Sequence, residues 1–101
     1  MAGGGSSGGR RPLPDFYWDE SNETKLLERH DVSALEAEQC FANRHSRKRG
    51  RGGANLLLGR TDGGRMLFLV YEQQAGGIVR VYSAREMTDK ERRAFRRATN
   101  G

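Results

Sequence analysis

The chain has 101 residues, 35% of them hydrophobic, with 18 lysines and arginines against 13 acidic residues and a formal net charge of +5. This length supports one small domain and argues against a large internal active site. No apolar run approaches the roughly 20 residues of a membrane span, and no secretory signal is evident. One cysteine, and no Cys/His cluster with zinc spacing, exclude a disulfide scaffold and a zinc ribbon. We therefore expect a basic, cytoplasmic domain with no metal and no cofactor.

The positive charge is rich in arginine and unevenly distributed. Arginine outnumbers lysine 15 to 3, and guanidinium groups bind phosphate bidentately and stack on bases. Residues 15–43 carry eight acidic side chains against two basic ones, whereas residues 44–65 carry seven basic side chains against Asp62 alone. This asymmetry favours nucleic acid as one partner and a protein as another. A solvated surface that only keeps the protein soluble is the alternative.

The first part of the chain predicts a tail, a strand and a helix. Residues 1–14 are rich in glycine and serine and predict a disordered tail, which leaves 15–101 as a single domain. The aromatic run 15–18 is typical of a strand. Asp19 is then expected to cap a helix over about residues 20–30.

A second helix and a basic loop are expected next. Asp31 suits the left-handed position that ends a helix. Ser33 and Glu36 have the spacing of a capping box, which predicts a helix to about residue 41. Residues 42–54 hold many cations and three glycines among few apolar side chains, so we expect a mobile basic loop.

Three strands and a helix complete the prediction. Strands are expected from residue 56, over 66–72 and over 78–84, with turn residues between them. Thr88 and Glu91 form a second capping box that opens a last helix. The predicted order is β-α-α-β-β-β-α, an α+β fold in which helices pack against an antiparallel sheet.

Alternation along the last strand suggests a binding surface. It assigns Val79, Val81 and Ser83 to one face, and Ile78, Arg80, Tyr82 and Ala84 to the other. On this interpretation Arg80 holds a phosphate beside a base stacked on Tyr82, and Arg85 joins Arg80 on the same phosphate. Alternatively, Arg80 pairs with an acid and Tyr82 covers the edge of the core.

Other candidates lie outside this strand. His30, beside Arg29 at a helix end, has the chemistry of a general acid or base, although such a histidine more often hydrogen-bonds a helix terminus. Cys40 is expected in the core rather than as a nucleophile. The basic loop offers the RNA-binding candidates Arg47, Lys48, Arg49 and Arg51, and the last strand offers Tyr82 and Ser83.

Several short motifs occur in one order along the chain. They are Phe16-Tyr17-Trp18-Asp19, Arg29-His30-Asp31-Val32-Ser33, Leu58-Gly59-Arg60, Gly64-Arg65-Met66-Leu67, Arg80-Val81-Tyr82-Ser83-Ala84-Arg85 and Glu91-Arg92-Arg93. Together, over roughly residues 15–97, they resemble the BrnT family of bacterial type II toxin–antitoxin systems. The resemblance implies a RelE-like fold and a ribonuclease toxin.

The implied reaction is metal-independent RNA cleavage, in which a ribose 2′-hydroxyl attacks the adjacent phosphorus and leaves a 2′,3′-cyclic phosphate. By motif position, the resemblance implies that Arg29 binds phosphate and His30 transfers a proton. It likewise implies catalytic roles for Arg60, Arg80 and Arg85, with no metal and no cofactor.

The resemblance also implies partners. These are RNA and a BrnA-type ribbon-helix-helix antitoxin, with the ribosome as a further candidate, operator DNA reached only through the antitoxin, and no membrane. The family's Glu-Arg pair has no counterpart in Gly53-Ala54-Asn55. Two alternatives therefore stay open: an RNA- or antitoxin-binding module with impaired cleavage, and a basic ribosome- or DNA-associated module that shares only the fold.

Overall fold

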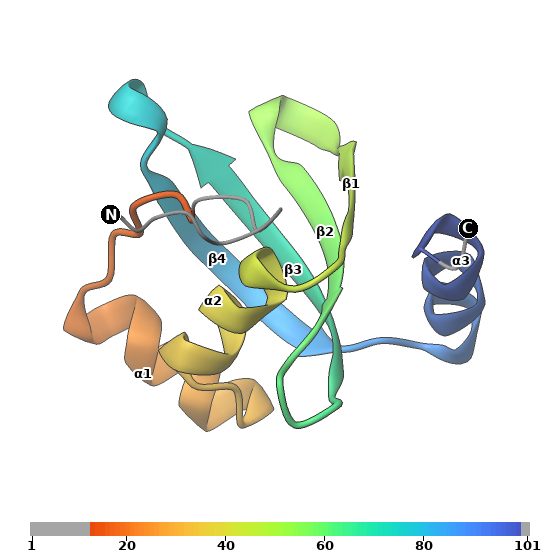
Figure 1. The fold of residues 1–101 in the computed structure, drawn as a ribbon. Coiled ribbons are helices and arrows are strands. Elements are labelled where there is room, and N and C mark those ends of the chain that lie inside the picture. Colours follow the sequence, from red (N-terminus) through yellow and green to blue (C-terminus); the bar gives the residue numbers. More distant parts are fainter. Residues whose placement is uncertain (1–12, 100–101) are drawn as a thin grey trace, which may run out of the picture.

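The computed structural model describes residues 13–99, which form a four-stranded antiparallel sheet and three α-helices (Figure 1). The helices are α1 (Glu20–His30), α2 (Ala34–Ala42) and α3 (Asp89–Thr99), and the strands are β1 (Ser46–Arg49), β2 (Asn55–Arg60), β3 (Met66–Gln73) and β4 (Val79–Glu86). The strand order is β1-β2-β3-β4. Helices α1 and α2 cover one face, and α3 lies apart from them beside β1 and β2. The predicted α+β class is confirmed.

Local signals set the helix boundaries as predicted. The Asp19 carboxylate accepts a hydrogen bond from the backbone N–H of Asn22 at 2.8 Å, and the Asn22 side-chain oxygen accepts one from the backbone N–H of Asp19, also at 2.8 Å. Asp31 ends α1 in the left-handed conformation, with φ 56°. The Ser33–Glu36 box opens α2. The boxes at Asp19 and Ser33 satisfy backbone N–H groups that the first helical turn leaves without partners, and the backbone N–H of Asp31 donates to carbonyl oxygens of the last turn of α1.

Two segments differ from the prediction. The aromatic run 15–18 forms no ladder strand; Phe16 makes a single parallel bridge to Val79. The expected mobile loop instead contains β1, whose four residues pair with β2 from Ser46–Leu58 to Arg49–Asn55. Charged side chains are tolerated there because β1 is an edge strand, and charge discourages further strand pairing. The predicted tail, residues 1–14, lies outside the described residues except for Leu13 and Pro14.

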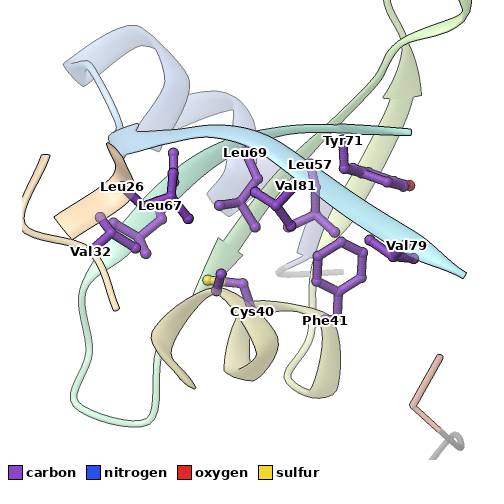
Figure 2. Packing of buried hydrophobic residues seen from close by; sticks show 12 residues of the cluster. Leu26, Val32, Cys40, Phe41, Leu57, Leu67, Leu69, Tyr71, Val79 and Val81 are labelled. Atoms are coloured by element: carbon purple, nitrogen blue, oxygen red, sulfur yellow. The ribbon is translucent and has the colours of Figure 1, made fainter. Parts of the chain in front are cut away.

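The core lies between the sheet and the helices α1 and α2. Figure 2 shows Cys40 and Phe41 of α2 pointing toward Leu57, Leu69 and Val81 of the sheet. These sheet residues are at most 1% exposed. Cys40 is completely buried, as expected of a core residue, and burial raises the pKa of its thiol to about 12. A buried, protonated thiol is a poor nucleophile.

A bulge interrupts the alternation of β4. Val70 pairs with Ser83 but the next residue, Tyr71, pairs with Val81, so Tyr82 is the extra residue. Ala84 is consequently buried, on the face of Val81. The predicted alternation holds through Tyr82, which contacts Arg80, and is wrong from Ser83 onward, because an inserted residue shifts every later side chain to the other face.

We expect Gly59→Ala to destabilise the fold. A Cβ at Gly59 would lie 2.8 Å from the Cβ of Cys40 and 3.0 Å from its carbonyl oxygen, so α2 would have to move from β2. Overpacking of this kind costs about 1–3 kcal/mol of unfolding free energy, measurable by urea denaturation. Gly63→Ala is the control, since its Cβ would meet only Thr61 Oγ1 at 3.9 Å. Equal stability of the two variants would contradict the close packing of α2 on β2.

Candidate nucleic-acid interface

The sheet face opposite α1 and α2 gathers basic side chains, and we call it the outer face. Side chains alternate along paired strands, so the register fixes its members. They are Ser46, Lys48, Leu56, Leu58, Arg60, Met66, Phe68, Val70, Glu72, Arg80, Ser83 and Arg85. Apolar residues of β2 and β3 occupy its middle, and cations border it on both sides. Five predicted site residues thus share one surface: Lys48, Arg60, Arg80, Ser83 and Arg85.

Arg80 is held between two exposed tyrosines. Its guanidinium carbon lies 5.1 Å from the ring centroid of Tyr17 and 5.6 Å from that of Tyr82. These rings are 43% and 48% exposed. Arg80 Nη2 lies 3.7 Å from Asp19 Oδ2, whereas its Nε is buried without an acceptor among the described residues. An arginine fixed by aromatic faces and lacking one hydrogen bond is well prepared for an oxyanion.

Glu72 completes this cluster, and the sequence analysis did not identify it. Glu72 pairs with Arg80 across β3 and β4, and its Oε1 accepts a 2.9 Å hydrogen bond from the Tyr82 hydroxyl. That bond raises the pKa of Tyr82, with the negative charge of Glu72 acting in the same direction. The exposed fraction of Tyr82 shows that it does not cover the core edge. Glu72 ends an apolar run, and only the strand register reveals that it faces Arg80.

Arg85 is occupied by a neighbour. Its Nη1 and Nη2 donate to Glu91 Oε1 and Oε2 at 2.8 and 2.9 Å, and its guanidinium carbon lies 4.3 Å from the Phe68 ring centroid. Glu91 also accepts from the backbone N–H of Thr88, so the predicted capping box is confirmed. The hydrogen bonds from Arg85 lower the pKa of Glu91 to about 2, although burial opposes this.

Arg80 and Arg85 do not share a phosphate in this geometry. Their partners on β3 are Glu72 and Phe68, four residues apart, which corresponds to about 13 Å at about 3.3 Å per residue. With Arg85 held by Glu91, the side chains as they stand do not form the predicted joint clamp, which stays a prediction.

Arg29 and His30 lie at the far end of α1 from Arg80. Asp19, which contacts Arg80, precedes the first residue of α1, and His30 is the last. The 11-residue helix separates them by about 16 Å. Both side chains are exposed and make no hydrogen bond within residues 13–99. Arg80 and His30 thus belong to separate places on the molecule.

The basic residues near β1 divide between two faces. Arg47 points to the helix side, where its guanidinium carbon lies 5.5 and 5.9 Å from the ring centroids of Phe41 and Tyr71. Lys48 belongs to the outer face, and Arg49 and Arg51 are exposed at the end of the β1–β2 hairpin. Arg47 therefore packs over the core edge while it stays exposed, and the other three are exposed away from that edge.

Arg60 lies in a hollow of about 790 Å³ between the β2–β3 turn, the segment before β1, and α3. Its lining includes Arg44, Arg96 and the apolar side chains Met66 and Phe95.

Within the described residues, no group of three or more His, Cys, Asp or Glu side chains is arranged to hold a metal ion. The same residues contain no helix that is long and apolar enough to cross a membrane.

These features define a small α+β domain with a four-stranded antiparallel meander, two helices on one face and a basic opposite face. Among solved structures it is similar to the ribonuclease toxin BrnT of Brucella abortus, with a TM-score of 0.62 and 14% sequence identity. The match covers 75% of this chain and 99% of that chain, so the chain has a BrnT-like fold. No protein-family model and no curated protein matches the sequence.

We expect Glu91→Gln to lower stability at neutral pH and not in acid. The folded-state pKa of about 2 lies below that of an unfolded glutamate, so the charged pair stabilises above about pH 4.5 and is lost as the pH falls toward 2. Glutamine keeps the capping box. The Arg85 side chain is 37% exposed, and after solvent screening we expect a loss of about 1–2 kcal/mol.

Urea denaturation of both proteins from pH 7 down to about pH 2.5 measures this difference. We expect the unfolding free energies of the wild type and Glu91→Gln to become equal as the pH falls toward about 2.5. If the unfolding free energies differ by the same amount at pH 7 and at about pH 2.5, the Arg85–Glu91 pair contributes through packing and not through charge.

Proposed function

We propose that this chain is the toxin of a type II toxin–antitoxin system, an endoribonuclease that cleaves RNA bound across the outer face without a metal ion. The observation that carries the proposal is the cluster in which Arg80 lies between Tyr17 and Tyr82 and faces Glu72. It combines a cation for phosphate, rings for bases and a carboxylate for a proton. The BrnT-like fold supports the same function.

The proposed reaction is in-line attack by the ribose 2′-hydroxyl on the adjacent phosphorus. Glu72 accepts the proton of that hydroxyl, and Arg80 stabilises the negative charge that develops on the non-bridging oxygens. The bond to the 5′-oxygen breaks, and this oxygen takes up a proton to leave as a hydroxyl. The other product end is a 2′,3′-cyclic phosphate. Tyr82 and Tyr17 position the bases by stacking.

Other predicted residues receive supporting roles in this proposal. Lys48, Ser83 and Arg85 contact the RNA backbone along the outer face, and Arg49 and Arg51 extend the basic surface past β1. Because α1 separates His30 from Arg80, we assign Arg29 and His30 to a second contact outside the Arg80 cluster. Their catalytic role stays a prediction that the variants below test.

The proposed biological partner is a BrnA-type ribbon-helix-helix antitoxin in the bacterial cytoplasm. The antitoxin would neutralise the chain and carry the complex to operator DNA, with the ribosome as a further candidate partner of the toxin. A protein that binds the outer face would cover the Arg80 cluster and block RNA. The negative charge of residues 15–43 offers this partner a second surface of opposite sign.

We expect the purified protein to cleave 5′-labelled RNA in EDTA and to leave 2′,3′-cyclic phosphate ends. Arg80→Ala and Glu72→Gln should each lower kcat/KM by about 100-fold or more, as expected for loss of an oxyanion contact or a general base. Arg97→Ala, an exposed arginine of α3 outside the cluster, is the matched control and should keep full activity. The decrease in kcat/KM should be smaller for His30→Ala than for Arg80→Ala.

If kcat/KM falls further in His30→Ala than in Arg80→Ala, the active site lies at the end of α1 and not at the Arg80 cluster. Wild-type activity in both Arg80→Ala and Glu72→Gln would contradict the proposed cluster. Thermal denaturation of each variant shows whether the fold is intact.

The second candidate function is an RNA- or antitoxin-binding module that cleaves poorly. The bidentate contact of Arg85 with Glu91 favours it, because that guanidinium is not available to a substrate without losing two charge-assisted hydrogen bonds. The same experiment separates the two functions. Binding of RNA by the wild type without any cleavage product would support the second.

A further inference from the structure

The hollow beside α3 is built from three separate parts of the chain. Arg44 precedes β1, Arg60 ends β2, and Arg96 comes from α3. Its volume of about 790 Å³ lies within the roughly 300–1,000 Å³ range of ligand sites. The site does not include Arg80 or Glu72 and is thus distinct from the proposed reaction centre.

Two of the three arginines make no hydrogen bond or ion pair with the part of the chain that the structure describes. Arg44 Nη1 donates to the carbonyl oxygen of Thr99. Within residues 13–99 the guanidinium groups of Arg60 and Arg96 make no hydrogen bond and no ion pair. Three cations that converge on one hollow repel each other unless an anion lies between them.

One carboxylate lines the hollow, and it is already engaged. Asp62 Oδ1 accepts a 2.9 Å hydrogen bond from Asn43 Nδ2, which also donates to the carbonyl oxygen of Arg60 at 2.8 Å. Asp62 therefore holds the β2–β3 turn against the segment before β1. Among the described residues that line the hollow, the positive charges exceed the negative by two.

An apolar wall adjoins the cations. Phe95 is 5% exposed and Met66 is half-buried, and both line the hollow. Met66 also pairs with Arg60 on the outer face, so the hollow opens onto the surface where the proposed RNA lies. Met66 thus gives the hollow a small apolar surface beside the guanidinium groups, which suits contact with the sugar that accompanies a phosphate.

We propose that this hollow is a second binding site for the phosphate backbone of RNA, away from the Arg80 cluster, in which Arg60 and Arg96 contact a phosphate and Arg44 supports them. This inference rests on the proposed function in taking RNA as the ligand. It assigns Arg60 to substrate binding and not to the chemical step. The two sites together would hold an extended strand across the sheet.

The test compares two neighbouring arginines of α3. Arg96 lines the hollow and Arg97 does not, so Arg96→Gln and Arg97→Gln remove the same charge from the same helix. The probe is a fluorescein-labelled, fully 2′-O-methylated oligoribonucleotide, which lacks the attacking hydroxyl and cannot be cleaved. Fluorescence anisotropy measures its affinity between about 50 and 200 mM KCl.

We expect Arg96→Gln and Arg60→Gln each to weaken binding by about five- to tenfold at the lower salt, as for loss of a charge-assisted contact at a partly exposed site. The slope of log K against log[KCl] should fall by about 0.7 for each lost phosphate contact on a single strand. Arg97→Gln should change the affinity less than about twofold, because an exposed charge outside the site contributes little. Inorganic phosphate should displace the probe only as well as KCl of equal ionic strength.

Equal losses in Arg96→Gln and Arg97→Gln would overturn the site, since the effect would then be general charge. Displacement by inorganic phosphate far below the effective KCl concentration would overturn the assignment to a polynucleotide. Cleavage of unmodified RNA by the wild type is measured separately. If the wild type cleaves RNA but Arg96→Gln binds the probe with wild-type affinity, the second binding site is contradicted and the proposed ribonuclease is not. If Arg96→Gln weakens probe binding but the wild type cleaves no RNA, the proposed ribonuclease is contradicted and the second binding site is not.

Discussion

The guanidinium of Arg65 contacts three elements, each of them more than 20 residues away from it in sequence. It donates to the carbonyl oxygen of Asp31 at 2.8 Å, to the carboxylate of Glu36 at 3.0 and 3.1 Å, and to Glu86 at 3.2 and 3.3 Å. These groups end α1, begin α2 and end β4. Burial acts to raise the pKa of Glu36, but hydrogen bonds from Ser33 and Arg65 hold it below its usual value. This contact ties the end of α1 and the start of α2 to the end of β4, beside the buried core that packs both helices on the sheet and leaves the outer face uncovered by them.

Local chemistry explains why the helices could be predicted and one strand could not. Asp19, Ser33 and Thr88 each start a helix through a hydrogen bond to a residue three positions later, which short-range spacing reveals. Strand β1 consists of serine and three cations without an apolar alternation. It forms because β2 offers a free edge, and that edge exists only after the sheet has assembled.

The residues of the site also divide into those that a local sequence pattern predicts and those that only the folded structure brings together. The neighbourhood of Arg80 and Tyr82 follows from their spacing in one strand. Glu72 and Tyr17 join them through the register of β3 and through the segment before α1, which no local pattern encodes. The bulge at Tyr82 also depends on pairing with β3, because alternation assumes that no residue is inserted.

The proposed function, a toxin that cleaves RNA, goes beyond the BrnT-like fold and rests on the cluster around Arg80. Its most direct test is induced expression in a bacterial host, with growth and the integrity of total RNA followed over time for the wild type and Arg80→Ala. The account predicts growth arrest with RNA loss for the wild type, and normal growth for a folded Arg80→Ala. Normal growth and intact RNA with soluble, folded wild-type protein would contradict it.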